Sequence, residues 1–245
     1  MDFKILNKKS LKELQDIGKD LGIENEINKT KLLIKIKECF KDYEKYKTEV
    51  KDKYEKIKQL GNKGKEGITY LVKDKKSGKE YAMKTFNKRK SIENIKKEGE
   101  LQRIAGNAGI SPNVIEIDLV SNNIVMEKLD EHLLDVMKRQ NGDLTEIQQM
   151  QILNIFNKLD EINVFQGDSN ILNYMLKGDQ IYIIDFGMSK LIDNKLKKKL
   201  KEDRPNFTLM NLGFILKLKE LNCPQSSYSY LIKYVNKENK IKYGL

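Results

Sequence analysis

The start of the chain carries apolar residues at helical spacing and polar residues that mark helix ends. Ser10 and Glu13 form the S-x-x-E pattern of a capping box, and Gly22 ends the helix that follows. Asn28 or Thr30 begins a second helix. The apolar positions of the two helices are Leu11, Leu14, Ile17 and Leu21, then Leu32, Leu33 and Ile36. Residues 10 to 37 therefore predict a helical hairpin, which runs on into a connector near residue 52.

Beyond that connector the period changes, and short apolar runs stand between longer helical patterns. Strands are predicted at 54–60, 80–86, 114–120, 123–126 and 181–184. A helix over 91–104 has Leu101 and Ile104 on its core side, and Gly99 in its middle predicts that it is short or mobile, since glycine costs about 1 kcal/mol relative to alanine there. Asp143 or Thr145 caps another helix, with apolar residues Leu144, Ile147, Met150, Leu153, Phe156 and Leu159.

Composition limits the classes of protein that fit this pattern. The chain has 245 residues, 39 % apolar and 34 % charged, which suits one mid-sized domain with a small appendage. It lacks an apolar run long enough to span a membrane and an uncharged signal core, so we expect a soluble, cytoplasmic protein without membrane partners. Cys39, Cys223 and His132 are too few and too scattered for a structural zinc site or a disulfide framework.

The net charge of +11 favours contact with polyanions such as ATP or nucleic acid. Of the 47 basic residues only four are arginine. Lysine acts as a point charge on phosphate, whereas reading of base edges favours the planar guanidinium. The charge therefore supports non-specific phosphate contact and no more.

Candidate chemistry is concentrated in residues 166 to 187. Asp168 and Asn173 lie on a predicted loop, a Lys-Gly-Asp turn follows, and the run 181–184 leads directly into Asp185-Phe186-Gly187. Two carboxylates and an amide that converge in this way suit a divalent metal bound with phosphate, because Mg²⁺ prefers hard oxygen ligands. The sequence D-x-x-x-x-N followed by D-F-G resembles the catalytic and metal-binding loops of the protein kinase superfamily. The alternative is a strand that ends in an ordinary turn.

The resemblance implies a role for each of these residues. In that family Asp168 orients the acceptor hydroxyl and takes its proton, while Asn173 and Asp185 bind Mg²⁺. Lys84, within Ala-Met-Lys, matches the lysine that holds the ATP phosphates and pairs with a helix glutamate. Glu98 is the best match to that glutamate, and Glu100 is the rival.

ATP contacts are implied in the same way. The loop 61–69 resembles the glycine-rich loop over the phosphates: Gly64 and Gly67 fit its second and third glycines, but Asn62 takes the place of the first. Ala82 and Met175 would enclose adenine from opposite sides, Met126 would guard its pocket, and the backbone at Glu127 and Leu129 would pair with its edge.

Several positions depart from the pattern of ordinary kinases. Gln166-Gly167 replaces the first two residues of H-R-D, Asn170 stands where Ser/Thr kinases place lysine, and Thr208 replaces a buried helix aspartate. The segment 190–204 is strongly basic, without an A-P-E motif. Abbreviated kinases of this type occur in the RIO and Bud32-like groups, and the strings around residues 167–190 resemble most the small kinases of large DNA viruses. This last resemblance implies a virus-encoded protein in an infected cell.

The N-terminal hairpin resembles the SAP and Rho-N-terminal helical modules, which bind DNA or RNA. Residues 1 to 52 hold 13 lysines against 11 acidic residues, a net charge of +2. The global charge is therefore not concentrated there. Weak nucleic-acid contact and protein docking both stay open for this module.

Together these features predict an α+β, two-lobed protein-kinase-like fold with a small N-terminal helical module. The module and connector take residues 1–52 and the kinase-like domain residues 53–245, with a β-rich small lobe at 53–126 and an abbreviated helical large lobe at 130–245. The implied function is transfer of the γ-phosphoryl group of ATP, with Mg²⁺, to Ser or Thr of a protein substrate. The alternatives are a small-molecule phosphotransferase of the aminoglycoside kinase type and a pseudokinase or nucleic-acid-binding scaffold.

Overall fold

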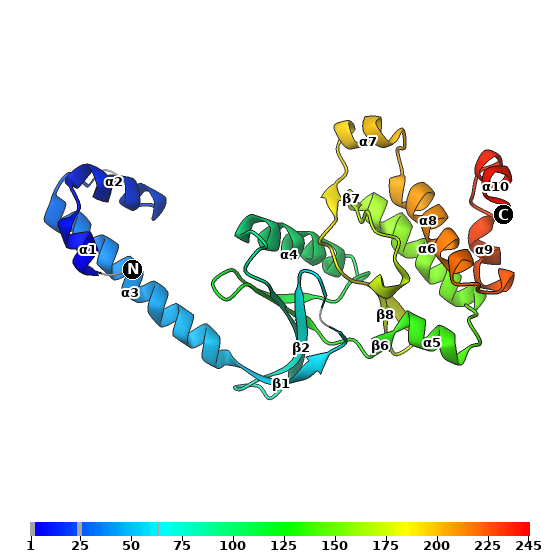
Figure 1. The fold of residues 1–245 in the computed structure, drawn as a ribbon, viewed down its shortest axis with the longest axis horizontal. Coiled ribbons are helices and arrows are strands. Elements are labelled where there is room, and N and C mark those ends of the chain that lie inside the picture. The colour runs from blue at the N-terminus through cyan, green and yellow to red at the C-terminus, as the bar shows by residue number, and fades with distance from the viewer. Residues whose placement is uncertain (1–2, 24–25, 63) are drawn as a thin grey trace. The chain divides into compact units, whose positions relative to one another are not determined.

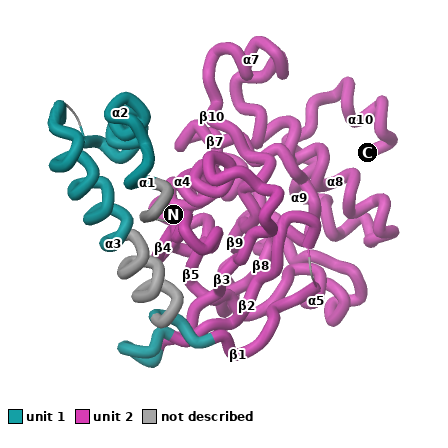
Figure 2. Tube along the Cα trace, turned by 60° about the vertical axis from the view of Figure 1, so that its left-hand side comes forward, with its two compact units in different colours: residues 1–55, 74–78 teal, residues 56–73, 79–245 magenta. Residues whose placement is uncertain are grey.

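A computed structural model describes residues 3–23, 26–62 and 64–245 of the chain. They form two compact units, residues 1–55 with 74–78 and residues 56–73 with 79–245 (Figure 2). Both Cys39 and Cys223 are free thiols, as expected. Among the described residues, the helices are all too short or too polar to cross a membrane.

The first unit is built from three helices: α1 (Phe3–Lys8), α2 (Leu11–Asp20) and α3 (Lys29–Lys53). The capping box at Ser10 is confirmed, since its hydroxyl accepts from the Glu13 N–H and the Glu13 carboxylate accepts from the Ser10 N–H at 2.8 Å. These bonds, with the ion pair to Lys9, lower the pKa of Glu13 to about 2. Asn28 caps α3 by accepting from two backbone N–H groups. The buried core is Leu6, Leu14, Leu32 and Ile36.

Two expectations for this unit were wrong. Helix α1 was not predicted, although its Leu6 is fully buried against the other two helices. Leu21, expected on the apolar face of α2, is more than a third exposed. It stands at the C-cap, where the backbone leaves the helix before Gly22 (φ +74°), so its side chain no longer follows the helical face.

A five-stranded sheet in the order β1-β2-β3-β5-β4 lies mostly in the second unit. Figure 1 labels its first two strands, β1 and β2. Its strands are β1 (Tyr54–Leu60), β2 (Gly67–Asp74), β3 (Glu80–Phe86), β4 (Val114–Asp118) and β5 (Asn123–Glu127). Helix α4 (Ile92–Asn107) packs against β4 and β5. A small core of Ala82, Phe86, Ile95, Ile124 and Met126 lies between helix and sheet.

Helix α4 differs from its prediction in length and in orientation. It runs for 16 residues although Gly99 lies in its middle. Gly99 lies close to the sheet, where a Cβ would be only 2.6 Å from Cδ1 of Ile117. Close packing therefore offsets the low helix propensity of glycine. Ile104 is 38 % exposed, whereas Leu101 and Ala105 are buried in the core of the helical lobe.

The remainder of the unit is mainly helical. Its helices are α5 (Leu133–Arg139), α6 (Glu146–Glu161), α7 (Asn194–Leu200), α8 (Asn211–Glu220), α9 (Ser229–Ile232) and α10 (Lys237–Tyr243), with a π-helical turn at Asn206–Met210 and 3₁₀ turns at Ile171–Asn173 and Gln225–Tyr228. Short strands β6 (Glu131–His132), β8 (Tyr174–Lys177) and β9 (Gln180–Ile183) form one sheet, and β7 (Val164–Phe165) pairs with β10 (Lys190–Leu191). With the five-stranded sheet, these elements confirm the predicted α+β, two-lobed kinase-like fold.

Helix α6 shows why a strict three-residue spacing misleads. Thr145 caps it, with Gln148 completing a capping box. Ile147 and Met150 are exposed, however, while Phe156 and Leu159 are fully buried. Each step of three residues falls about 60° short of a full turn, so a series at that spacing winds around the helix instead of marking one face.

Candidate functional site

Two polar residues flank a tight hairpin at the same end. Strands β8 and β9 pair antiparallel, and Gly178 (φ +57°) allows the turn between them. Asn173 lies directly before β8 and Asp185 follows β9 after one residue. The Ile184 N–H donates to the carbonyl oxygen of Asn173 at 2.8 Å, which holds the two ends side by side.

The side chains of Asp168 and Asn173 are in direct contact. Nδ2 of Asn173 donates to Oδ2 of Asp168 at 3.0 Å and to its carbonyl oxygen at 3.3 Å. The other carboxylate oxygen of Asp168 accepts from the Asn170 N–H at 3.0 Å. Because the amide nitrogen of Asn173 is used in this way, its Oδ1 is the atom that remains as an acceptor.

Asp185 is held in an uncommon backbone conformation. Its φ is +62°, in the left-handed region that non-glycine residues rarely adopt outside sites where structure imposes it. Phe186, the next residue, is buried in the core of the helical lobe, and the Gly187 N–H donates to Oδ1 of Asp185 at 3.2 Å. The Asp185 side chain is about half exposed. Burial of Phe186 thus directs the carboxylate out of the core.

Lys84 connects this carboxylate to helix α4. Its Nζ lies 2.7 Å from Oε1 of Glu98 and 3.1 Å from Oδ1 of Asp185. Glu98 is almost fully buried. Burial works against the charge on Lys84, but the two carboxylates outweigh it and raise the pKa of Lys84. Burial likewise opposes ionisation of Asp185, and Lys84 outweighs it, so the pKa of Asp185 lies below its ordinary value. The rival of Glu98, Glu100, instead pairs with Arg103 at 2.8 Å.

Gln166 joins the loop of Asp168 to the loop of Asp185. Its buried Nε2 donates to the carbonyl oxygens of Ile184 and Asp185 at 3.1 and 2.8 Å, and its Oε1 accepts from the Asp168 N–H at 3.2 Å. The Gln166 N–H donates to Oδ1 of Asn206 at 3.1 Å. A buried amide therefore braces both loops at once.

Asn206 and Asp160 support the loop of Asp168 through hydrogen bonds to its preceding residues, and neither was predicted. Asn206 Nδ2 donates to Asp160 Oδ1 at 2.6 Å and to the Val164 carbonyl oxygen at 2.8 Å. Thr208, in the place expected for a buried aspartate, bonds only back to Arg204 within its own turn. The polar residue that supports the loop is thus Asn206, two positions before Thr208 and at the start of the π-helical turn. No spacing rule indicates that shift.

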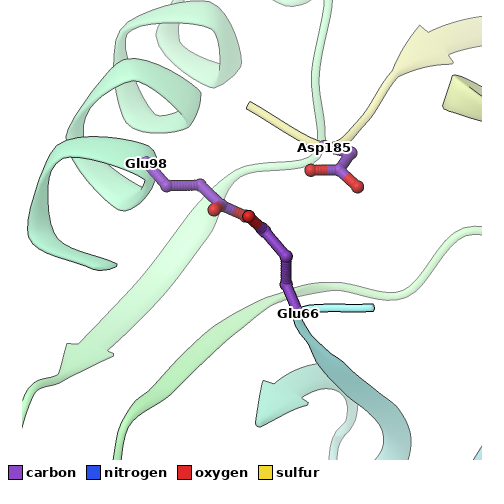
Figure 3. Close-up of side chains that lie close together, drawn as sticks. All are labelled: Glu66, Glu98 and Asp185. Atoms are coloured by element: carbon purple, nitrogen blue, oxygen red, sulfur yellow. The ribbon is translucent and has the colours of Figure 1, made fainter. Parts of the chain in front are cut away.

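Lys90 and Glu66 also lie at this site, and no sequence pattern indicated either residue. The Lys90 ammonium contacts the carboxylates of Glu66 and Glu98. One carboxylate oxygen from each of Glu66, Glu98 and Asp185 lies within 4.8 Å of the others (Figure 3). Lys90 belongs to a basic run that resembles an ordinary solvated surface, so only the fold reveals its burial.

The residues implied for adenine binding lie on two sheets and on the link between them. Ala82 and Met126 are paired neighbours on β3 and β5 and share the small core, with Glu127 at the end of β5. Leu129 is buried, and Met175 on β8 pairs with His132 of β6. The structure thus brings Lys84 into direct contact with Glu98 and Asp185, and Asp168 into contact with Asn173. The five adenine candidates lie on β3, on β5, on the link that follows β5 and on β8.

In the glycine loop, Gly64 and Gly67 differ in their surroundings. A Cβ at Gly67 would lie 2.2 Å from the Thr85 carbonyl oxygen, so the strand pairing of β2 with β3 requires glycine there. At Gly64 a Cβ would meet only the Gly67 carbonyl oxygen, at an ordinary 3.5 Å. Lys63, between Asn62 and Gly64, lies outside the described residues.

Comparison with known proteins gives relatives, several of which are named as protein kinases. Calcium-dependent protein kinase 27 of Oryza sativa is 33 % identical over 164 aligned positions, 58 % of this chain and 26 % of that protein. A probable serine/threonine-protein kinase BUD32 homolog of Archaeoglobus fulgidus is 29 % identical over 120, which covers 49 % of this chain and 57 % of the relative. A probable bifunctional tRNA threonylcarbamoyladenosine biosynthesis protein of Methanosphaera stadtmanae is 27 % identical over 113, covering 46 % of the chain and 21 % of the relative.

These matches span between about a fifth and somewhat over half of the length of the relatives. No protein-family model matches the chain. In sequence as in fold, the chain is similar to protein kinases at modest identity.

Proposed function

We propose that the protein is a kinase that transfers the γ-phosphoryl group of Mg²⁺-ATP to a Ser or Thr hydroxyl of a protein substrate. The observation that supports this best is the joining of two groups of residues. Lys84, Glu98 and Asp185 form one ion-paired set, Asp168 and Asn173 form another, and Gln166 links the two through the backbone. Phosphoryl transfer needs mainly such positioning and charge stabilisation.

The polar groups at the hairpin end suit a magnesium ion. Asp185 offers a half-exposed, ionised carboxylate, and Asn173 offers its amide oxygen because Asp168 engages its nitrogen. Both are hard oxygen donors of the kind that Mg²⁺ prefers. When bound, Mg²⁺ neutralises phosphate charge and bridges the phosphates to the protein. Asn173 and Asp185 would be its protein ligands.

Each protein group then has a defined part in the reaction. Lys84 holds the phosphates and Glu98 fixes the lysine, since their nitrogen and oxygen lie 2.7 Å apart. Asp168 accepts the proton of the acceptor hydroxyl, while the oxygen of that hydroxyl forms a bond to the γ-phosphorus. The bond from that phosphorus to the bridging oxygen breaks, and ADP leaves with the bonding electrons. Adenine would lie among Ala82, Met126, Met175 and the backbone of Glu127 and Leu129, beneath the loop with Gly64 and Gly67.

The N-terminal module would add a weak, non-specific contact with nucleic acid. Leu6, Leu14, Leu32 and Ile36 form a core of their own, and exposed lysines that could contact phosphate include Lys8, Lys12, Lys19, Lys29, Lys31 and Lys41. Deletion of residues 1–52 should then flatten the salt dependence of duplex binding, because each phosphate that the module neutralises adds roughly 0.9 to the slope. Equal slopes for the full and shortened chains would assign any such binding elsewhere.

The acceptor class can be tested with radiolabelled ATP, Mg²⁺, a mixed protein panel and a parallel panel of small-molecule alcohols. We expect label on protein, and phosphoserine or phosphothreonine after hydrolysis. Label on the alcohols alone would favour the small-molecule phosphotransferase. ATP binding without transfer to either panel would favour a pseudokinase scaffold.

A further inference from the structure

A second buried lysine lies beside Lys84 and is not explained by the roles given above. Lys90 stands on the link between β3 and α4, immediately before the Ser91 cap of that helix. Its side chain is 7 % exposed, its ammonium contacts the carboxylates of Glu66 and Glu98, and its Nζ lies 4.7 Å from the ring centroid of Phe86. A lysine so desolvated needs anionic partners at all times.

Its partner Glu66 is carried by the glycine loop, and the backbone there is fixed. The Asn87 N–H donates to the Glu66 carbonyl oxygen and the Asn87 side chain donates to the Lys65 carbonyl oxygen, both at 2.8 Å. These bonds tie the loop to the segment that leads to Lys90. The Glu66 carboxylate lies close to Gly187 of the D-F-G sequence: a Cβ added at Gly187 would be 2.8 Å from Oε2 of Glu66.

The charges of this cluster do not balance. Lys84 and Lys90 supply two positive charges against the three carboxylates of Glu66, Glu98 and Asp185 (Figure 3). Mg²⁺-ATP is still an anion after the charge of the ion is counted, so the proposed substrate brings further negative charge to the cluster. Like charges at such distances repel strongly where water is partly excluded, so one of the carboxylates must give way.

Burial decides which one moves. The Glu98 side chain is 1 % exposed and holds both lysines, whereas that of Glu66 is 48 % exposed and can turn into solvent while the buried pairs of Glu98 stay intact. Lys90 cannot follow it, since its own side chain is enclosed. Departure of Glu66 leaves a free donor on the Lys90 ammonium, which stays on the same Glu98 carboxylate that holds Lys84.

We propose that Lys90 is a second phosphate-binding lysine and that the Glu66 carboxylate holds the place of a nucleotide phosphate on it until the nucleotide binds. This inference rests on the proposed ATP-dependent function, and it assigns a residue that the kinase resemblance did not include. Glu66 therefore competes with the nucleotide, and Lys90 attracts it. Glu66 thus lowers the affinity for nucleotide and Lys90 raises it, although the two side chains form an ion pair with each other.

The test is titration calorimetry of the full chain with ATP, ADP and adenosine, each with Mg²⁺. Lys90→Met should weaken binding of ATP and ADP by about tenfold, because one charge-assisted hydrogen bond is removed, with adenosine unchanged. Lys90→Arg should retain most of the affinity. Glu66→Gln should tighten ATP binding by about threefold, because a competing charge is removed. Lys88→Met, an exposed lysine of the same run, is the matched control.

The outcomes separate the two proposals. If the unmodified chain binds no ATP, the proposed function fails and this inference fails with it. If it binds ATP and Lys90→Met binds ATP equally well, only the inference fails. Equal weakening of adenosine and ATP by Lys90→Met would show a structural role instead. Weaker ATP binding by Glu66→Gln would contradict the proposal that the Glu66 carboxylate competes with phosphate. This result does not depend on whether the Lys90 variants fold.

Discussion

Nε2 of Gln166 donates a hydrogen bond to the carbonyl oxygen of Asp185 at 2.8 Å. The two residues belong to the two loops of the site, and Gln166 is completely buried. This amide occupies the first position of the motif that reads H-R-D in ordinary kinases. Gln166, which stands in place of the histidine of that motif, therefore braces the two loops. The departure from the motif does not by itself indicate an inactive protein.

Gln166→Met should destabilise the protein and slow phosphoryl transfer. The substitution keeps the side-chain volume but removes the donor to the partly buried carbonyl groups of Ile184 and Asp185, at a cost of about 1–3 kcal/mol in the free energy of unfolding. Loss of loop alignment should reduce kcat more than it raises KM for ATP. Denaturant unfolding and steady-state kinetics measure the two effects. Gln225→Met, at an exposed glutamine, should stay within about 0.5 kcal/mol of the unmodified chain. Unchanged stability and kcat for Gln166→Met would show that the brace is unimportant.

Alanine substitutions at the two glycines of the loop should have opposite profiles. Gly67→Ala places a methyl group 2.2 Å from the Thr85 carbonyl oxygen, so strand β2 must shift, and we expect a loss of about 2 kcal/mol or more in unfolding free energy. Gly64→Ala meets only an ordinary contact and should leave stability nearly unchanged. If the loop covers phosphate, Gly64→Ala should still weaken ATP binding, since the methyl group blocks close backbone approach. Thermal unfolding and ATP titration of both variants check this; equal stability of the two would contradict it.

The ion pairs of the site set its dependence on pH. Because the pKa of Lys84 is raised, its contribution to stability is complete below the ordinary lysine pKa and is lost only as pH rises through the raised value. The pKa of Asp185 is lowered, so its contribution is complete above the ordinary carboxyl pKa and is lost as pH falls through the lowered value. Neither group should titrate between about pH 7 and about pH 9.

Calorimetry across that range should therefore show Mg²⁺-ATP affinity without a transition from Lys84 or Asp185. Lys84→Met should bind ATP more weakly at every pH and leave the shape of the profile unchanged. A transition near neutral pH that disappears in Lys84→Met would show that Lys84 titrates there, contrary to the raised pKa.

The parts of the fold that sequence predicts best are those fixed by local chemistry. The capping box at Ser10, the helix cap for which Thr145 was one of two candidates, and the hairpin around Gly178 follow from short-range hydrogen bonds and backbone freedom. The contact of Lys84 with Glu98 could be expected from the family resemblance, which pairs this lysine with a helix glutamate. Its contact with Asp185, 101 positions along the chain, was not predicted.

What sequence could not predict depends on the tertiary environment. Gly99 looked like a weakness of α4, yet it allows close packing on Ile117. Asn206, Glu66 and Lys90 are polar residues of common types, and only the tertiary structure shows which of the many such side chains lie at the site. Asparagine and lysine are frequent in this chain, so their type carries little information.

The most direct test of the proposed catalytic arrangement compares Asp168→Asn with Asp185→Asn, in protein labelling by radiolabelled ATP and in Mg²⁺-ATP affinity by calorimetry. The proposed function assigns Asp168 to the acceptor hydroxyl, so Asp168→Asn should lower the labelling rate by about a hundredfold or more and leave nucleotide affinity largely intact. Asp185→Asn should reduce both, because the metal ligand is removed. Full labelling by Asp168→Asn would contradict the assignment of the catalytic base and, with it, the proposed mechanism.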